Sequence, residues 1–142
     1  MNLEPLLCVA SGVSQAVIAT LTISLNTPRS ATDKMLSGPL VEFFRESWLG
    51  GTGVAHNDPR VNLMYANLAG LPPINYYGAH EVLAGEIREF ADRAKAASVD
   101  VSLHSVPGGQ HLFLLGAGRV PETDAAIAEM GQWLRSKLAV TR

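Results

Sequence analysis

The stretch Leu71-Pro72-Pro73-Ile74-Asn75-Tyr76-Tyr77-Gly78-Ala79-His80-Glu81-Val82-Leu83 determines the fold predicted for this chain. Two prolines end whatever precedes them, and a short run of β-branched and aromatic residues closed by a glycine is typical of a strand. Apolar residues at helical spacing follow at once: Val82, Leu83, Ile87, Phe90, Ala91 and Ala94. We therefore predict a strand at 74–77, a sharp turn, and a helix at 81–97, which is a connection typical of α/β proteins.

The sequence on either side of this unit predicts two more strands. Residues 16–25 form a β-branched run, and residues 100–106 alternate apolar with polar side chains. Strands that alternate with helices in this way indicate a parallel sheet with crossover connections. The predicted fold is therefore α/β, with about three parallel strands flanked by helices.

Four further helical segments are predicted from apolar spacing and terminal residues. Residues 1–12 and 32–36 predict a short helix and a helical turn, respectively. Pro39 begins a helix at 39–49, whose apolar stripe we expect in the core: Leu40, Phe43, Phe44 and Trp48. Pro121 begins the last helix, at 121–138, and its expected buried face comprises Ile127, Met130, Leu134 and Leu138.

Composition limits the class of protein. A chain of 142 residues suits one domain, and its net charge of −2 with pI near 6.0 gives no electrostatic reason to expect nucleic acid or an anionic membrane as partner. Residues 6–25 contain too many polar side chains for a membrane span, and no basic segment precedes them. Cys8 is alone, so no internal disulfide is expected and a cytoplasmic location is the default.

Two turns hold the residues best suited to chemistry. His80 and Glu81 follow the predicted strand at 74–77, and the turn Pro107-Gly108-Gly109-Gln110-His111 follows the predicted strand at 100–106. Side chains at the carboxyl ends of parallel strands are placed for catalysis in α/β folds. An imidazole at such a position suits proton transfer near neutral pH.

The order and spacing of several motifs resemble the C-terminal half of an α/β-hydrolase, in particular the hormone-sensitive-lipase-like esterases of bacteria. The resemblance covers roughly residues 16–138. It depends on the order and spacing of seven segments: Ala31 to Leu36, Trp48 to Gly51, Asp58-Pro59-Arg60-Val61, Tyr65 to Pro73, Gly78 to Leu83, Ala94 to Val101, and Pro107 to Phe113. It implies that residues 1–15 are a remnant helix, that 16–56 contribute a strand plus helices, and that 57–142 carry the acid and histidine turns.

The same resemblance suggests roles for three residues. His111 matches the general base of the family. His80 occupies the position where the family has its catalytic Asp, and an imidazole cannot supply that charge. Glu81 is the neighbouring carboxylate, although a position one step along a turn is expected to direct its side chain elsewhere.

The serine nucleophile and oxyanion loop of the family have no clear counterpart. Gly12-Val13-Ser14-Gln15-Ala16 is the nearest match to G-x-S-x-G, but a strand-like run follows it where the motif needs a helix. We therefore expect an esterase/lipase fragment that is inactive alone and that acts on a small acyl ester only if a partner chain completes it. The alternatives are a non-catalytic module that dimerises through an exposed sheet edge and a decayed remnant without a role.

Metal and cofactor chemistry is not predicted. His80, His104 and His111, with Glu81, match no usual spacing of metal ligands. The glycines at 108–109 and 116–118 are not followed by the Lys-Ser/Thr of a phosphate-binding loop.

Overall fold

The computed structural model describes residues 33–78 and 81–137, which contain two strands, three α-helices and two short 3-10 helices. In chain order these are α2 (Gly38–Leu49), η1 (Leu63–Tyr65), β1 (Ile74–Gly78), α3 (Ala84–Ala96), β2 (Val101–Ser105), η2 (Phe113–Gly116) and α4 (Pro121–Lys137). The predicted strand at 16–25 and helix at 1–12 lie outside the described residues.

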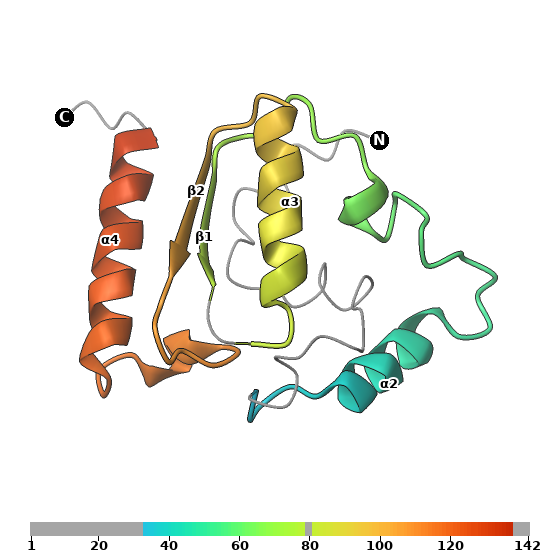
Figure 1. Cartoon of the computed structure of the whole chain (residues 1–142), viewed down its shortest axis with the longest axis horizontal. Coiled ribbons are helices and arrows are strands. Elements are labelled where there is room, and N and C mark those ends of the chain that lie inside the picture. Colours follow the sequence, from blue (N-terminus) through green and yellow to red (C-terminus); the bar gives the residue numbers. More distant parts are fainter. Residues whose placement is uncertain (1–32, 79–80, 138–142) are drawn as a thin grey trace.

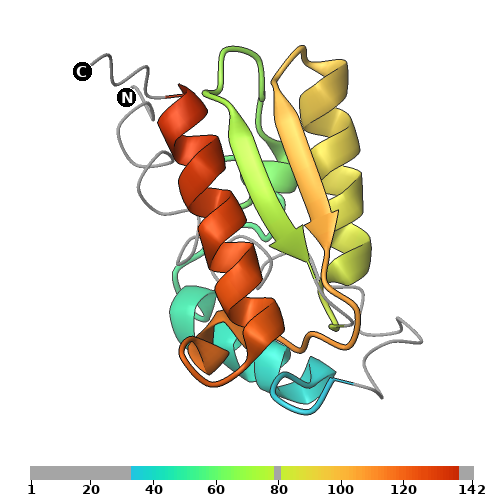
Figure 2. The same ribbon diagram turned by 90° about the vertical axis from the view of Figure 1, so that its left-hand side faces the viewer.

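The two described strands form a parallel sheet, as predicted. Ile74 of β1 is paired with Val101 of β2, and the register continues to Gly78 and Ser105. The helix α3 connects the strands and lies on one side of them, while α4 lies on the other (Figure 1). Figure 2 shows that both strands point toward the same end of the molecule, where α2 and the segment after β2 also lie.

Alternation along β1 directs successive side chains to the two faces of the sheet. Tyr76 packs against the core cluster that α3 forms with Val41 of α2, whereas the Tyr77 hydroxyl donates to Glu129 of α4 at 3.0 Å. The face under α3 is the apolar one. Its predicted side chains Val82, Leu83, Ile87, Ala91 and Ala94 are all buried, and Phe90 packs against them partly buried.

Helix α2 begins and ends where its sequence indicates. The Ser37 hydroxyl accepts from the Leu40 N–H at 3.4 Å, and Pro39 occupies the first turn. At the other end the Gly50 N–H donates to Glu46 O, and a Cβ at Gly50 would lie 2.4 Å from that oxygen. The close approach explains why a glycine is required there.

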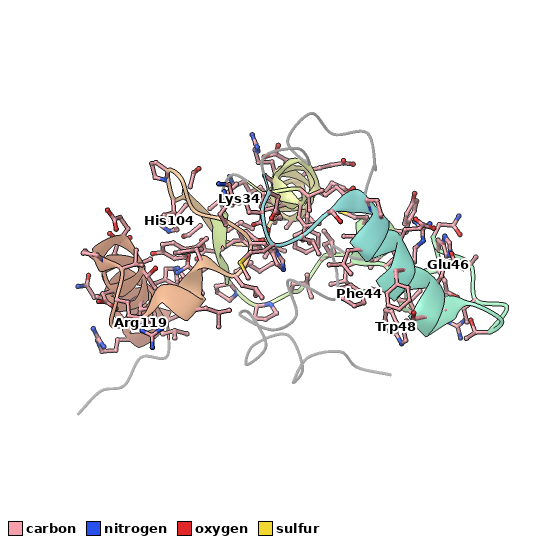
Figure 3. The ribbon with its side chains drawn as sticks, turned by 90° about the horizontal axis from the view of Figure 1, so that it is seen from below. Lys34, Phe44, Glu46, Trp48, His104 and Arg119 are labelled. Atoms are coloured by element: carbon pink, nitrogen blue, oxygen red, sulfur yellow. The ribbon has the colours of Figure 1, made fainter. Side chains whose placement is uncertain are left out.

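The buried face predicted for α2 is wrong. Leu40, Phe43, Phe44 and Trp48 are 37–63% exposed, and the helix instead buries Val41 and Leu49. Phe44 and Trp48 lie on the same side of the helix in Figure 3. These aromatic side chains have no core to fill within the described part of the chain, because the core lies on the opposite side of α2.

The buried face predicted for α4 is wrong as well. Ile127 and Leu134 are 41% and 44% exposed, Met130 is half-buried, and Leu138 lies outside the described residues. The buried side chains are Thr123 and Ala126, and the Thr123 hydroxyl donates to Phe113 O at 3.0 Å. Helix α4 therefore buries small and polar side chains near its N-terminal end, and polar contacts continue along it through Glu129 to Tyr77 and Lys137 to Asp100.

Two segments begin differently from the prediction. Residues 33–36 form a bend held by the Asp33 side chain rather than a helical turn. Helix α3 starts at Ala84, three residues later than predicted, so Glu81 to Leu83 belong to a turn between β1 and the helix. Within the described ranges, no helix is long and apolar enough to cross a membrane.

Candidate acid–base site

The candidate site lies at the carboxyl ends of β1 and β2. Glu81 is in the turn that follows β1, and His111 is in the segment between β2 and η2. Parallel pairing places the ends of the two strands side by side, because Gly78 is in register with Ser105. Residues that are 30 positions apart in the sequence therefore lie next to each other.

Glu81 and His111 form a close hydrogen-bonded pair. The Nδ1 atom of His111 lies 2.6 Å from Oε2 of Glu81, and the two side chains are only 12% and 6% exposed. Such a short contact between an imidazole and a carboxylate is typical of a charge-assisted hydrogen bond. We expected the turn to direct the Glu81 side chain away from His111, and this expectation is wrong. Glu81 lies in the turn before α3 rather than in the helix itself.

A tight turn brings His111 to this position. The Gly109 N–H donates to Val106 O at 3.1 Å, and Gly108 has φ = 72°. Proline at the second position and a positive-φ glycine at the third are the signature of a type II turn, which matches Pro107-Gly108. Leu112, directly after the histidine, also has a positive φ of 57°. The backbone thus reverses on both sides of His111.

Tyr76 of β1 lies beside the acid. Burial raises the pKa of the Tyr76 phenol far above its usual range, and the Glu81 carboxylate raises it further. The buried side chains of Val82 and Leu83, at 2% and 1% exposed, lie directly after Glu81. The carboxylate therefore lies at the border of the apolar core, where water competes little for its hydrogen bond.

The arrangement suits a separate function for each ring nitrogen. Next to an ionised carboxylate, which only accepts hydrogen bonds, Nδ1 of His111 carries the proton and is the hydrogen-bond donor. Nε2 then has a free lone pair and is able to accept a proton. This is the geometry of an oriented general base, in which the carboxylate holds the tautomer and stabilises the imidazolium that forms.

Of the other residues singled out from the sequence, His80 and Ser14 lie outside the described residues. His104 projects from β2 and stacks on Tyr77, with ring centroids 4.4 Å apart and planes at 11°. Within residues 33–78 and 81–137, no group of three or more His, Cys, Asp or Glu side chains is arranged to hold a metal ion.

One residue at the site was given no role there by the sequence analysis. Asp33 accepts a hydrogen bond from the Val82 N–H at 3.0 Å, across 49 positions of the chain. Its sequence signal is weak, because an Asp shortly before a helix most often caps a local turn. Asp33 also does that here, and only the tertiary structure shows the second contact.

The fold and the Glu81–His111 pair at its strand ends are compatible with an α/β-hydrolase, and comparison with known proteins shows this class. A family described as having the alpha/beta hydrolase fold matches residues 7–115. The chain therefore belongs to the α/β-hydrolase family.

Within this family the chain is similar to bacterial esterases. It superimposes on a hormone-sensitive lipase from a metagenome library with a TM-score of 0.76 and 27% identity, covering 85% of this chain and 41% of that one. An esterase from the bacterial hormone-sensitive lipase family gives a TM-score of 0.77 and 30% identity, over 85% and 40% of the two chains. An esterase of Acinetobacter venetianus is 30% identical over 80 residues, which are 56% of this chain and 26% of that protein. The chain thus spans about a quarter to two-fifths of the length of these relatives.

Proposed function

We propose that this chain supplies the acid–base part of a carboxylic-ester hydrolase site, with His111 as general base and Glu81 as the acid that orients it. The observation that carries the proposal is the buried 2.6 Å contact between Glu81 Oε2 and His111 Nδ1. The similar proteins are esterases and a hormone-sensitive lipase, which makes a small to medium acyl ester the substrate class to test.

Ester hydrolysis by this chemistry needs more than a base. The base removes a proton from a serine hydroxyl, and backbone N–H groups stabilise the oxyanion that forms. Within the described ranges, Glu81 is the side chain hydrogen bonded to His111, and no serine hydroxyl is bonded to Nε2. We propose that a second polypeptide supplies the nucleophile and the oxyanion donors, and that the chain alone does not turn over esters.

A hybrid protein tests this proposal. The part of a hormone-sensitive-lipase-family esterase that this chain does not match is fused ahead of the chain, and hydrolysis of p-nitrophenyl butyrate is measured. We expect turnover that falls roughly 10³-fold or more on His111→Gln, because removing the base of a triad enzyme has at least that effect. Glutamine keeps a donor for Glu81, so the loss reports the base rather than the fold. His56→Gln, whose side chain is 47% exposed, is the matched control and should leave the rate unchanged.

The lone chain provides the second arm of the test. Hydrolysis by the pure chain should equal that of its His111→Gln variant, and a fluorophosphonate should not label it. Turnover that disappears on Ser14→Ala would show instead that the chain completes its own site. In that case the need for a second polypeptide is rejected, while the function of His111 stands.

A non-catalytic interaction module is the second candidate, and the exposed face of α2 favours it. Phe43, Phe44 and Trp48 are 47–63% exposed, and aromatic side chains grouped in this way are typical of binding surfaces. Light scattering of the pure chain separates the two functions. A stable dimer that Phe43→Ser and Trp48→Ser dissociate, together with a hybrid protein that folds but lacks turnover, would favour the module.

A further inference from the structure

The segment just before α2 is hydrogen bonded to a neighbour of each member of the acid–base pair. Asp33 uses its two carboxylate oxygens differently: Oδ1 accepts from the N–H groups of Met35 and Leu36, each at 2.9 Å, and Oδ2 accepts from the Val82 N–H at 3.0 Å. Val82 directly follows Glu81 in the chain. The carboxylate therefore joins its own bend to the turn that carries the acid.

The next residue contacts the turn that carries the base. The Lys34 N–H donates to Oε1 of Gln110 at 2.8 Å, and Gln110 directly precedes His111. Figure 3, which is seen from the end where the strands finish, shows Lys34 in the segment that leads into α2. Asp33 and Lys34 are thus hydrogen bonded to the residues next to Glu81 and His111, respectively. In the sequence, α3 and β2 lie between those two turns.

We propose that Asp33 is a positioning residue, which holds the turn of Glu81 at the distance that His111 requires. The proposal rests on the proposed function of the Glu81–His111 pair. Helix α3 begins only at Ala84, and its first turn holds the preceding turn through carbonyl groups: Glu81 O accepts from the Ala84 N–H at 3.2 Å and Leu83 O from the Ile87 N–H at 3.1 Å. The Val82 N–H instead donates to Asp33, which adds a second hold on this turn from another part of the chain. A hydrogen bond from a backbone N–H to an ionised carboxylate is about twice as strong as a neutral one. A contact of 2.6 Å needs its partners placed within about 0.5 Å, and the Asp33–Val82 bond supplies that placement.

Gln110 completes the arrangement from the other side. Its amide oxygen is held by the Lys34 N–H, and the order of that N–H depends on the bend that Asp33 caps. Loss of the Asp33 carboxylate therefore loosens the acid turn directly and the base turn indirectly. A purely local function of Asp33, in which it caps its own bend and nothing more, predicts no effect on the pair.

Asparagine at position 33 distinguishes these two functions. Asparagine has one side-chain oxygen, which is able to keep the bend by accepting from Met35 and Leu36. Its NH₂ group then faces the Val82 N–H. Both groups are hydrogen-bond donors, so the bond between positions 33 and 82 is lost. If Asp33 is a positioning residue, Asp33→Asn disturbs the pair as strongly as Asp33→Ala does. If Asp33 only caps the bend, Asp33→Asn behaves as the unaltered chain.

The readout is the ¹⁵N NMR spectrum of the His111 ring in the full chain, which needs no substrate and no turnover. In the unaltered chain we expect a single tautomer with the proton on Nδ1 and a far-downfield signal for that proton. Asp33→Asn should bring the two ring nitrogens toward the averaged shifts of a mobile imidazole and remove the downfield proton signal. Gln110→Ala should have a smaller effect in the same direction, and Gln110→Glu, which keeps the acceptor oxygen, should restore the spectrum.

Asp58→Asn is the matched control. Asp58 also caps its own turn, with Oδ1 accepting from the Arg60 N–H at 2.9 Å; it is half-buried, and its carboxylate is bonded to Arg60 rather than to either turn of the site. This variant should leave the His111 signals unchanged. The amide signals of Tyr77 and His104 show in every variant that the sheet is folded.

The outcomes separate this inference from the function on which it rests. If Glu81→Gln changes the His111 spectrum but Asp33→Asn and Gln110→Ala do not, Asp33 is not a positioning residue and the pair stands. If Glu81→Gln leaves the spectrum unchanged, the pair itself is rejected. An effect of Asp58→Asn equal to that of Asp33→Asn would also overturn the inference, because the change would then follow any loss of a carboxylate cap.

Discussion

The Glu81 carboxylate is buried at the edge of the apolar core, where a charge without a hydrogen-bonding partner is costly. It is 5% exposed, and the His111 imidazole is its hydrogen-bonded partner at 2.6 Å. A buried charge that loses its partner is strongly destabilising, whereas a neutral donor in the same place recovers part of the interaction. The pair is therefore a structural feature of the chain as well as a candidate for catalysis.

His111→Ala and His111→Gln should differ in stability for this reason. We expect His111→Ala to lower the free energy of unfolding by about 3 kcal/mol, since it leaves the Glu81 carboxylate without its partner. His111→Gln should lower it by only about 1 kcal/mol, because the amide is able to donate to Oε2. Urea unfolding followed by circular dichroism measures both. Equal losses would show that the carboxylate is solvated and that the pair is not buried in solution.

The sequence identified His111 and Glu81 as candidate site residues, but it did not predict that they are in contact. The glycine-rich turn and the position after a strand indicated the histidine. Glu81 was assigned to the first turn of a helix, because its apolar neighbours have helical spacing. The helix begins later, and the Val82 N–H is bonded instead to Asp33, 49 positions away. No local pattern reports a hydrogen bond of that separation.

At the scale of elements, α2 shows that apolar spacing and burial are separate properties. The spacing correctly predicted a helix at 39–49, but the stripe Phe43, Phe44 and Trp48 is exposed while Val41 is 1% exposed. A stripe in the sequence indicates which side chains need cover, not whether the same chain provides it. The chain spans about two-fifths of the length of similar solved esterases.

Two substitutions in α2 test which face is the buried one. Val41→Ala should lower the free energy of unfolding by about 2 kcal/mol, because it removes packed methyl groups from the core under α3. Phe43→Ala, at a position that is 63% exposed, should change it by no more than about 0.5 kcal/mol. Thermal unfolding of the two variants gives the comparison. A larger loss for Phe43→Ala would place the core on the other side of the helix.

The end of α3 offers a stabilising substitution. Ser98 has φ = 63°, a left-handed conformation that costs a residue with a Cβ, while its N–H donates to Lys95 O and the Val99 N–H to Ala94 O. Ser98→Gly should raise the free energy of unfolding by about 0.5 kcal/mol, since glycine adopts this conformation without strain. Ser98→Ala, which keeps the Cβ, is the control and should not stabilise. Denaturant unfolding of both variants decides the matter, and stabilisation by alanine would argue against the left-handed conformation.

At the scale of the whole molecule, the two faces of the sheet differ in chemistry. Tyr76 enters the apolar core between β1, α2 and α3, and Tyr77 faces α4, where its hydroxyl donates to Glu129. Burial raises the pKa of both phenols above the ordinary value of 10.0, and the Glu81 and Glu129 carboxylates add to the effect at Tyr76 and Tyr77 respectively. Both faces of the sheet are thereby sensitive to alkali.

Stability should therefore fall in alkaline solution. Below pH 10 the phenols are protonated in the folded and unfolded chains, and their contribution to stability is complete. As the pH rises above 10, the unfolded chain releases protons that the folded chain retains, so the free energy of unfolding decreases. Urea unfolding at pH 8 and pH 11 measures the difference. Tyr76→Phe should reduce the loss between these two values, and an unchanged loss would show that Tyr76 is not buried in the core.

The most direct measurement of the central claim is the ¹⁵N spectrum of the His111 ring compared between Glu81→Gln and His80→Ala. The claim is that Glu81, and not the residue in the position where related esterases are expected to have their acid, orients the base. We predict that Glu81→Gln removes the downfield Nδ1 proton signal of His111, while His80→Ala leaves the ring signals as they are. The opposite pattern, with the signals sensitive to His80→Ala and insensitive to Glu81→Gln, would contradict the account.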